Sequence, residues 1–314
     1  MNICVLGGSG FVGTELVTRL VQAGHWVRIP TRNLAAADRL RVLDTAELRP
    51  ANVHDPRVLS QLFQDCSVVI NLIGILNEQG RNTFARVHTD LAAKVIAAAR
   101  RAGVRRILHM SSLGASEGAP SRYLRSKAAA EAALKAPSQA EQGQPAVTVF
   151  RPSVIFGAGD SLTNRFAHLL RSSGGVLPLA RAGARFAPIS VLDVAEAFMR
   201  ALTRPGSAGA SYELCGPEVL TLEQIVRLSA QVAGRPCHIL KLPDPIAWLQ
   251  GAVMGLLPGK PFSLDNFRSL TLDSVCRENG CAALGIAPRR MLAELPLYLS
   301  PTRAQLRPGL HLPE

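Results

Sequence analysis

The feature that most constrains the fold is a glycine motif that directly follows a short apolar run at the start of the chain. Residues 2–6 (NICVL) predict a strand, and Gly7, Gly10 and Gly13 follow in the spacing G-x-x-G-x-x-G. Residues 11–23 have the apolar periodicity of a helix. A strand, a glycine-rich turn and a helix in this order are typical of the first βαβ unit of a dinucleotide-binding sheet.

Strand-like and helix-like patterns alternate through the first half of the chain. Further strands are predicted from WVRIP at 26–30, CSVVINLIG at 66–74, RRILHMSS at 105–112 and AVTVFRP at 146–152. Residues 90–102 predict another helix. The alternation predicts an α/β protein with a Rossmann-type, doubly wound parallel sheet, which binds its ligand at the carboxyl ends of the strands.

The regular alternation fades after Pro152, where loops and proline-rich joints become frequent. Amphipathic helices are predicted at 190–202 and 221–234. We expect residues 1–152 to form the dinucleotide-binding core. Residues 153–314 are expected to form a smaller, irregular lobe that binds substrate or a partner and interleaves with the core.

The glycine loop predicts a cradle for a pyrophosphate. A side chain at Gly7 or Gly10 would obstruct the turn or the approaching phosphate, and Gly13 lets the helix lie close to the strand. Backbone amides at the start of the helix then face the phosphates, together with the positive end of the helix dipole. These amides belong to Ser9, Phe11 and Val12. The alternative is a turn that merely requires flexible residues.

The end of the second predicted strand indicates which nucleotide is bound. Specificity for NAD usually involves a carboxylate there, which accepts from the ribose 2′-hydroxyl. This chain instead has Thr31, Arg32 and Asn33. A guanidinium can form a charge-assisted fork with a 2′-phosphate, worth about 1.5–3 kcal/mol. We therefore predict NADP(H) in preference to NAD(H); the alternative is that Arg32 is an ordinary solvated cation.

Tyr123 and Lys127 lie four residues apart in a segment of strong helix propensity, SRYLRSKAAAEAAL from residue 121. This spacing places both side chains on one face of a helix. In a reductase, the phenol donates a proton to a carbonyl oxygen and the ammonium stabilises the phenolate. The alternative is a surface helix that carries the two residues at this spacing by chance.

Several motifs together resemble those of the extended or atypical short-chain dehydrogenase/reductase superfamily, over about the first two-thirds of the chain. They are the glycine motif at 7–13, VVINLIG at 68–74, ILHMSSLGAS at 107–116, the Tyr123 and Lys127 pair, FRPSVIFG at 150–157 and PISVLDVAEA at 188–197. Within the superfamily, IPTRN, NLIG, SRYLRSKA and RPSVIFG resemble the NADPH-binding accessory subunit of respiratory complex I and its bacterial relatives. That subunit is regarded as an atypical member that holds the nucleotide without established turnover.

The resemblance implies a set of site residues. It assigns nucleotide binding to Gly7, Gly10, Gly13, Arg32 and Lys127, and the lining of the nucleotide site to Leu72, Ile73, Gly74, Pro152 and Val154. It also implies that Tyr123 and Lys127 face the nicotinamide ribose, and that Asn52 stands where the family often has an aspartate near the adenine. The contact made by Asn52 is therefore expected to be weaker or different.

The catalytic serine departs from the family pattern. Catalytic members carry a serine or threonine about two dozen residues before the tyrosine, whereas Ser111 and Ser112 precede Tyr123 by only twelve and eleven residues. We assign the catalytic role to Ser111. The loop that would position a substrate is expected to be short.

Composition bounds the partners. Lys and Arg exceed Asp and Glu by 35 to 23, a formal net charge of +12, which favours an anionic partner such as a phosphorylated cofactor, an acidic lipid surface or nucleic acid. Aromatic residues make up only 5% of the chain, so nucleic acid is the least favoured of the three. A small-molecule substrate is expected but not identified, and a peripheral membrane or respiratory-complex contact remains an open alternative.

Cysteines and histidines indicate neither a disulfide framework nor a metal. The six cysteines include no Cys-x-x-Cys pair, which predicts a reduced, cytoplasmic chain without a secretion signal, peripheral to the inner face of a membrane if it contacts one. Cys276 and Cys281 are interpreted as packed thiols. His54, His88 and His109 have no spacing typical of a metal site, and we predict that they pack or hydrogen-bond locally.

The longest apolar stretch is IAWLQGAVMGLL at 246–257. As a helix it would span roughly 18 Å, too short for about 30 Å of hydrocarbon. We favour a buried helix of the second lobe. The alternative is a helix that lies in a lipid interface through Trp248, between Lys241 and Lys260, or that meets a partner.

Two functions remain. The first is an NADP(H)-dependent oxidoreductase that acts on a carbonyl, sugar-like or quinone-related substrate, and Tyr123 and Lys127 favour it. The second is a non-catalytic subunit that holds NADPH and assists or senses assembly of a membrane respiratory complex. The short spacing between serine and tyrosine favours this second function. We favour the oxidoreductase.

Overall fold

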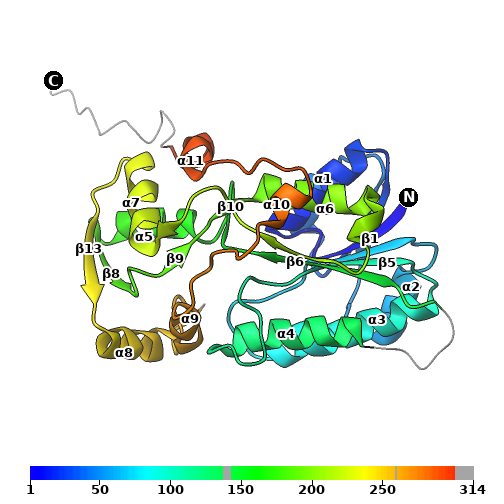
Figure 1. Cartoon of the computed structure of the whole chain (residues 1–314), viewed down its shortest axis with the longest axis horizontal. Coiled ribbons are helices and arrows are strands. Elements are labelled where there is room, and N and C mark those ends of the chain that lie inside the picture. Colours follow the sequence, from blue (N-terminus) through cyan, green and yellow to red (C-terminus); the bar gives the residue numbers. More distant parts are fainter. Residues whose placement is uncertain (137–142, 259, 301–314) are drawn as a thin grey trace, which may run out of the picture.

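A seven-stranded parallel sheet in the order β11-β6-β5-β4-β1-β2-β3 forms the centre of the larger half of the molecule (Figure 1). The structure is a computed structural model, and it describes residues 1–136, 143–258 and 260–300. The strands are β1 (Asn2–Leu6), β2 (Trp26–Thr31), β3 (Ala46–Pro50), β4 (Val68–Asn71), β5 (Arg106–Met110), β6 (Ala146–Pro152) and β11 (Ser211–Leu214). The strand order reverses between β1 and β4, which places the ligand crevice at their carboxyl ends.

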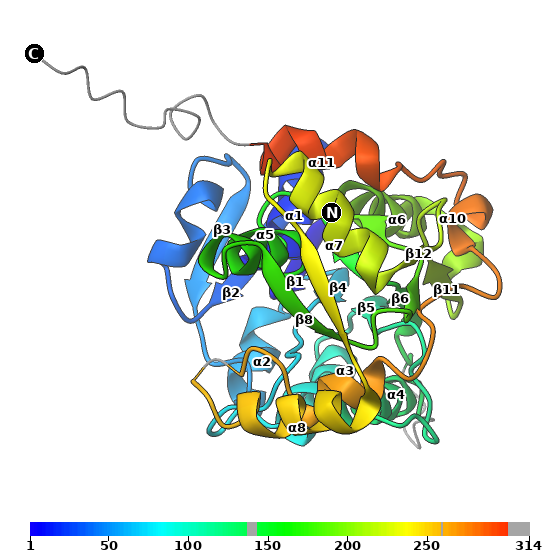
Figure 2. The same cartoon turned by 90° about the vertical axis from the view of Figure 1, so that its left-hand side faces the viewer.

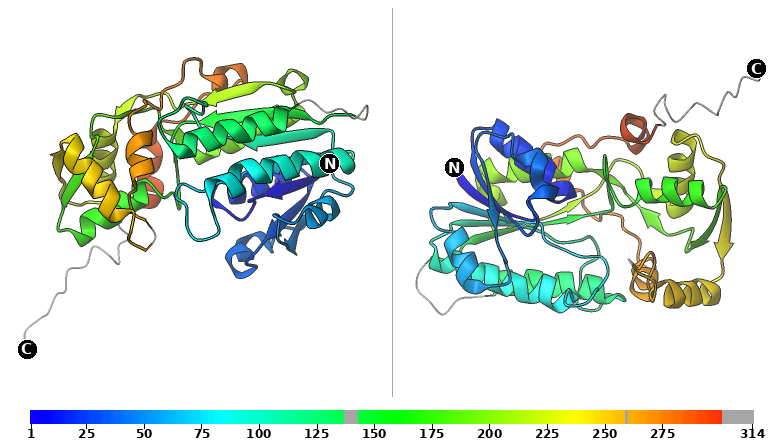
Figure 3. Two further views of the ribbon diagram at one scale, coloured as in Figure 1. Left: turned by 90° about the horizontal axis from the view of Figure 1, so that it is seen from below. Right: turned by 180° about the vertical axis from the view of Figure 1, so that it is seen from behind.

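Helices cover both faces of the sheet, and the apolar core lies in two layers between them. On one face α1 (Phe11–Gln22) packs against α6 (Val191–Thr203). On the other face lie α2 (Pro56–Leu62), α3 (Leu91–Arg101) and α4 (Arg122–Lys135), with α3 and α4 side by side (Figure 3). The predicted doubly wound α/β fold is confirmed.

All five predicted strands are present, but the sheet contains two that the sequence analysis did not predict. These are β3 and β11, which form its two edges. Edge strands are covered on fewer sides, and β3 accordingly has no fully buried residue. Without a continuous apolar run or a clear alternation, neither strand produces a sequence signal. β11 pairs with β6. Residues beyond 152 therefore complete the core sheet.

A smaller, irregular lobe lies beside the carboxyl ends of the strands, as predicted (Figures 1 and 2). It contains the strand pairs β7 (Ile155–Phe156) with β10 (Ile189–Ser190), β8 (Val176–Ala180) with β13 (His238–Leu242), and β9 (Arg185–Phe186) with β12 (Leu220–Thr221). Its helices are α5 (Thr163–Ser172), α7 (Leu222–Val232), α8 (Asp244–Met254), α9 (Leu264–Ser269) and α11 (Met291–Leu299). The short α10 (Gly280–Ala283) packs against β11.

Buried carboxylates fasten this lobe to the core. Asp193 at the start of α6 is paired with Arg289, and its Oδ2 also accepts from the Arg289 amide at 2.7 Å. Glu294 on α11 accepts from the Ser190 hydroxyl at 2.6 Å. The chain between residues 286 and 299 is thereby held against the strand end that precedes α6.

The expectation of a reduced chain is wrong for two of the six cysteines. Cys215 and Cys276, 61 positions apart, form a disulfide, so Cys276 is not a packed thiol. The loop before α10 runs back from the lobe to the end of β11 and brings the two residues together, a long-range contact that local sequence patterns do not encode. Cys281 is a free, buried thiol as expected.

The favoured interpretation of residues 246–257 is also wrong. They form most of α8, but only Ala247 and Gly251 of that helix are buried. The large apolar side chains of the segment are exposed instead. No helix in the part of the chain that the structure describes is long and apolar enough to cross a membrane.

Candidate nucleotide site and Tyr–Lys pair

Backbone segments approach each other closely at the glycine loop, residues 7–13. Gly7 has a φ of +80°, in the left-handed region that favours glycine. A Cβ atom on Gly13 would lie 2.2 Å from the Gly7 carbonyl oxygen and 2.6 Å from the Cα of Gly8. A Cβ atom on Gly7 would lie 3.2 Å from the amide nitrogen of Ile73, at the end of β4. Only hydrogen atoms at these positions allow the loop to close this tightly.

The start of α1 has the donors that an anion requires. Gly10 is the N-cap residue, and no side chain caps the helix. Within the described residues, the amides of Ser9, Phe11 and Val12 donate to no protein acceptor. Unpaired amides at a helix N-terminus, with the positive end of the helix dipole, form an anion site. The loop therefore fits the diphosphate of a dinucleotide.

Arg32 and Asn52 follow β2 and β3 and so lie at the same edge of the sheet as this loop. Arg32 follows β2 directly, is exposed, and forms no ion pair with any residue that the structure describes. Asn52 follows β3, and its side-chain oxygen accepts from the amide of His54 at 3.1 Å. Burial lowers the pKa of His54, and the charge of Arg32 lowers it further. An exposed guanidinium without an ion-pair partner among the described residues therefore lies at the carboxyl end of β2.

The residues that were expected to line the nucleotide also lie at this edge of the sheet. Leu72, Ile73 and Gly74 follow β4, and the Ile73 amide is held by the side chain of Asn71 at 3.2 Å. Pro152 ends β6, where its carbonyl accepts from Leu113 at 2.9 Å. Val154 follows, and its carbonyl accepts from Ile189 at 3.0 Å. The structure thus places the predicted lining segments at the carboxyl ends of β4 and β6.

Lys127 is a buried cation beside the β4 loop. Its side chain is only 4% exposed, and Nζ donates to the Met110 carbonyl at 3.1 Å. A Cβ atom on Gly74 would lie 3.0 Å from Nζ. Burial lowers the pKa of Lys127 to about 8. The ammonium therefore lies next to Gly74 and to the end of β5.

Tyr123 lies one helical turn before Lys127, and the pKa of its phenol responds to burial and to Ser112. Burial raises the pKa of the phenol, and a hydrogen bond with the Ser112 side chain lowers it. Ser111 is different, because its Oγ is buried with no partner among the described residues. Consecutive residues of an extended chain point to opposite sides. Ser112 therefore lies beside the tyrosine, and the catalytic role of Ser111 stays a prediction.

The N-terminus of α4 is held by a residue from the other lobe. Asp265 on α9 accepts from the amide of Arg122 at 2.7 Å and from the amide of Tyr123 at 2.9 Å. Ser121 caps the same helix by accepting from Leu124 at 3.2 Å. The sequence analysis missed Asp265, because no local pattern joins residues 142 positions apart. The sequence signals Asp265 only as an acidic residue in the first turn of α9.

His88 links Tyr123 to the loop after β4. Its Nε2 accepts from the Ile75 amide at 3.0 Å, so the proton lies on Nδ1, which is 2.7 Å from the Ser126 hydroxyl. That hydroxyl donates to the Tyr123 carbonyl at 2.7 Å. Burial, and then Lys127, lower the pKa of His88 to about 3, so the ring is neutral. The described residues contain no group of three or more His, Cys, Asp or Glu that could hold a metal.

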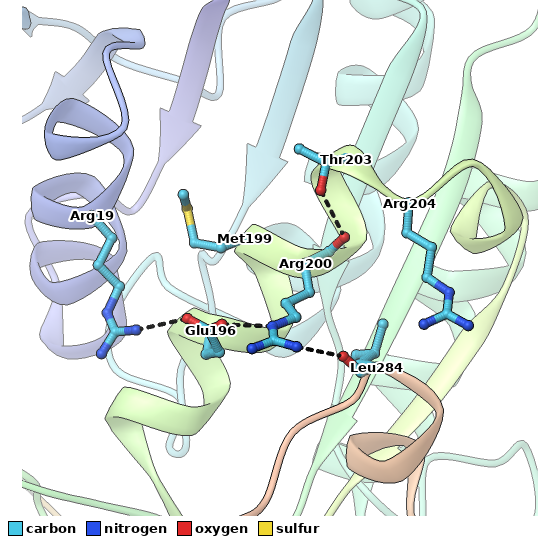
Figure 4. Close-up of a pocket in the computed structure, with 7 residues that line it drawn as sticks. All are labelled: Arg19, Glu196, Met199, Arg200, Thr203, Arg204 and Leu284. Carbon is cyan, nitrogen blue, oxygen red and sulfur yellow. Dashed lines mark hydrogen bonds and ion pairs between the residues drawn. The ribbon is translucent and has the colours of Figure 1, made fainter.

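A separate shallow hollow of about 610 Å³ lies on the outer face of α1 and α6 (Figure 4). Two of its arginines, Arg19 and Arg200, pair with the same carboxylate of Glu196, at 3.0 Å and 2.7 Å. The charges are thus used to hold the helices together. No residue of the glycine loop lines the hollow, and we assign it no function.

Comparison with known proteins agrees with this arrangement. The profile of the NAD dependent epimerase/dehydratase family matches residues 3–215, which include the glycine loop and the Tyr123 and Lys127 pair. The chain belongs to this family. Its NAD(P)-binding fold and the predicted short-chain dehydrogenase/reductase resemblance are thereby confirmed.

Two relatives represent different uses of the family fold. The chain is 32% identical over 292 residues to the mitochondrial NADH dehydrogenase [ubiquinone] 1 alpha subcomplex subunit 9 of Arabidopsis thaliana, covering 88% of this chain and 71% of that protein. It is 31% identical over 252 residues to the ceramide reductase of Caulobacter vibrioides, covering 80% of this chain and 77% of that protein. The predicted similarity to the complex I subunit is confirmed.

Solved structures share the fold at lower identity. The Bacillus cereus UDP-glucuronic acid 4-epimerase, in complex with UDP-glucuronic acid and NAD, superimposes with a TM-score of 0.75 at 15% identity, over 95% of this chain and 98% of that one. The Escherichia coli NADPH-dependent quinone oxidoreductase QOR2, complexed with NADPH, gives 0.72 at 19% identity, over 93% and 98%. Members of this fold therefore bind either nucleotide.

Proposed function

We propose that the protein binds NADP(H) and reduces a carbonyl group, with Tyr123 as the proton donor. The observation that carries the proposal is the cluster of Tyr123, Ser112 and Lys127 at the crevice edge. Although the chain from serine to tyrosine is short, the Ser112 hydroxyl reaches the phenol. The similarity to a ceramide reductase supports a reductase rather than an epimerase.

Each side chain has a defined task in this reaction. When bound, the nucleotide supplies the hydride that reduces the carbonyl carbon. Tyr123 gives its phenolic proton to the carbonyl oxygen, and Ser112 holds that oxygen and the phenol by its hydroxyl. Lys127 stabilises the phenolate that remains. An ammonium about 4 Å from a phenolate contributes about 4 kcal/mol at an effective dielectric constant of about 20, or roughly three pKa units.

Replacing the phenol tests the reductase. We expect Tyr123→Phe to lower kcat by about 10²- to 10⁴-fold, because it removes the proton donor while leaving the ring in place. The assay follows NADPH oxidation with panels of ketones, sugar nucleotides and quinones. NADPH affinity should stay within about twofold. Tyr212→Phe, a phenol on β11 that stacks on Phe150, is the matched control. Unchanged turnover by Tyr123→Phe would reject the mechanism.

Replacing the guanidinium tests the choice of nucleotide. A charge-assisted fork onto a 2′-phosphate is worth about 1.5–3 kcal/mol, so we expect Arg32→Glu to remove a preference for NADPH over NADH of about 10- to 100-fold. Thermal-shift titrations with both nucleotides measure the preference. Arg235→Glu, at an exposed arginine of the other lobe, is the control. Equal affinity of the unmodified protein for both nucleotides would reject the NADP(H) assignment.

A second function is favoured by the similarity to the complex I subunit: holding NADPH as a structural ligand in a membrane respiratory complex. A ligand at 100 times its Kd adds roughly 2.7 kcal/mol to stability, so folding would follow the nucleotide pool. The two functions differ in turnover. Nucleotide that co-purifies with the protein, is identified by mass spectrometry as NADPH and is not consumed by any carbonyl offered would favour the second function. Recovery of the protein with intact respiratory complexes would also favour it.

A further inference from the structure

Helix α8 is packed with its small residues inward and its large residues outward. Ala247 and Gly251 are its only buried residues, and a Cβ atom on Gly251 would lie 3.3 Å from backbone atoms of Ser263 and Leu264. The exposed large apolar side chains of the helix and of the turn that follows it, which we call the α8 face, are Ile246, Trp248, Leu249, Val253, Leu256 and Leu257. Leu249 is 56% exposed and Leu256 is 87% exposed.

This packing is the reverse of that of a helix on a monomeric protein, which buries its large apolar side chains. Within 246–257 the one polar side chain is Gln250, and there is no charged residue. The α8 face is therefore a contiguous apolar surface of the kind that marks a binding site for a membrane or an apolar partner. Trp248 suits a position between apolar and polar surroundings.

The charges around the α8 face identify the partner. The acidic side chains nearby are engaged: Asp244 pairs with Arg181 at 2.7 Å, and Asp265 accepts two backbone amides. Lys260 follows the face directly and Arg268 is exposed on α9. Neither cation pairs with a carboxylate among the residues that the structure describes. An apolar face with uncompensated cations at its rim fits a bilayer that contains anionic lipids.

The α8 face is joined to the Tyr123 site through α9. Helices α8, α9 and α4 follow one another along the same edge of the molecule (Figure 1). Asp265 on α9 holds the amide of Tyr123, and Ser263 donates to Asn77 at 2.8 Å in the loop that leads from Gly74. Leu76 in that loop is also an exposed apolar residue. A surface that covers the α8 face would thus adjoin the mouth of the site.

We propose that the α8 face docks on an anionic bilayer and holds the mouth of the Tyr123 site at the membrane surface, so that the carbonyl substrate is a lipid dissolved in the bilayer. The docking rests on α8 alone, whereas the substrate class rests on the proposed function. The two parts therefore need separate measurements.

The two tryptophans of the chain provide a direct test of docking. In the variant Trp26→Phe, Trp248 is the single tryptophan that fluoresces. In Trp248→Phe, the single tryptophan is Trp26, which is exposed at the start of β2. Vesicles of phosphatidylcholine with phosphatidylglycerol should shift the Trp248 emission to shorter wavelength and leave Trp26 unchanged. Vesicles of phosphatidylcholine alone should bind the protein at least fivefold more weakly, because they offer no anionic headgroups to Lys260 and Arg268.

Charges placed on the α8 face should abolish the partition. The double variant Leu249→Glu with Val253→Glu, at positions one helical turn apart, is expected to lower vesicle binding at least tenfold in flotation. Val42→Glu is the matched control, since Val42 is 80% exposed on the Rossmann half. Tyr123→Phe should bind vesicles as the unmodified protein does. No emission shift of Trp248 with either vesicle, or equal flotation of the double variant, would overturn the docking.

A protein partner predicts other outcomes. If light scattering finds a dimer that the double variant dissociates, the α8 face binds a second copy and the lipid proposal is wrong. The substrate class is tested by turnover: NADPH oxidation with a long-chain ketone or quinone in the vesicles should fall at least tenfold in the double variant, and a water-soluble carbonyl should not. Equal loss for both would overturn the substrate class. Vesicle binding without turnover of any carbonyl would reject the proposed function and leave the docking in place.

Discussion

Helices α1 and α8 are similar in length and apolar content, yet they face opposite surroundings. Helix α1 buries Leu16 and Leu20 against the sheet, and its outer side carries the ion pair between Glu15 and Arg19 at 2.7 Å. Helix α8 buries no large side chain. The difference lies in the polar residues: α1 has a polar stripe that fixes its outer side, whereas α8 has none along most of its length. Apolar periodicity predicts that a helix forms, but without a polar stripe it does not predict which side is covered.

The two helices also use a buried glycine for different purposes. Gly13 of α1 brings the helix onto the glycine loop so that amides face a ligand. Gly251 of α8 brings that helix onto the backbone before α9, which turns its large side chains away from the protein. In both helices the close approach leaves groups unpaired, backbone amides beside α1 and large apolar side chains on α8. The cost in apolar burial falls on α8 alone.

The largest expected effect is on the free energy of unfolding, when a leucine is replaced by alanine in each of the two helices. Leu16→Ala should lower the free energy of unfolding by about 2–5 kcal/mol, because it removes a fully buried side chain and leaves a cavity. Leu249→Ala should change it by no more than about 0.5 kcal/mol, as for an exposed position. Urea denaturation of both variants measures the pair. A cost of several kcal/mol for Leu249→Ala would show that α8 is buried in solution and would remove the contrast.

The sequence predicts the parts of this molecule that local patterns determine. The glycine loop, five strands and the Tyr123 and Lys127 helix each depend on residues that are neighbours in the chain. The Ser111 assignment stays a prediction, because the choice between Ser111 and Ser112 depends on which side of an extended segment faces α4. Of the two serines, Ser112 is the one that lowers the pKa of Tyr123.

Contacts between distant segments are what the sequence does not predict. The Cys215 to Cys276 disulfide and the Asp265 contact with the start of α4 join residues 61 and 142 positions apart. Each depends on how the second lobe returns to the core. The exposure of α8 belongs to the same class, since it follows from the fit of Gly251 against the chain before α9.

The next effect concerns charge. The Rossmann half buries the Lys127 ammonium, whereas the α8 face exposes apolar side chains. Each arrangement lowers the free energy of unfolding. Lys127 has a pKa of about 8 in the folded protein and about 10.5 in the unfolded chain. Below pH 8 both states hold the proton. Between pH 8 and 10.5 only the unfolded state does, so the free energy of unfolding should rise with pH, by roughly 3 kcal/mol in all.

Lys127→Met should lack this rise, because no proton is exchanged at that position. Urea denaturation of the nucleotide-free protein and of the variant at pH 7, 8, 9 and 10 gives the difference between the two. At pH 7 the variant should be the more stable of the two, and the gap should close as the pH rises. Parallel curves for the two proteins would show that Lys127 keeps an ordinary pKa.

The smallest expected effect compares the two glycines. A Cβ atom on Gly13 would lie 2.2 Å from a backbone oxygen, so Gly13→Ala must displace the glycine loop, at a cost of about 1–3 kcal/mol. A Cβ atom on Gly251 would lie 3.3 Å from its nearest neighbours, a contact that a shift of a few tenths of an ångström relieves. Alanine also gains roughly 0.5–1 kcal/mol over glycine within a helix, which offsets the crowding in Gly251→Ala.

The two variants should also differ in nucleotide binding. Isothermal titration with NADPH should find no binding to Gly13→Ala and unchanged affinity in Gly251→Ala. NADPH binding by Gly13→Ala as tight as that of the unmodified protein would mean that the diphosphate does not lie on this loop, since the loop cannot keep its geometry with a methyl group at that position.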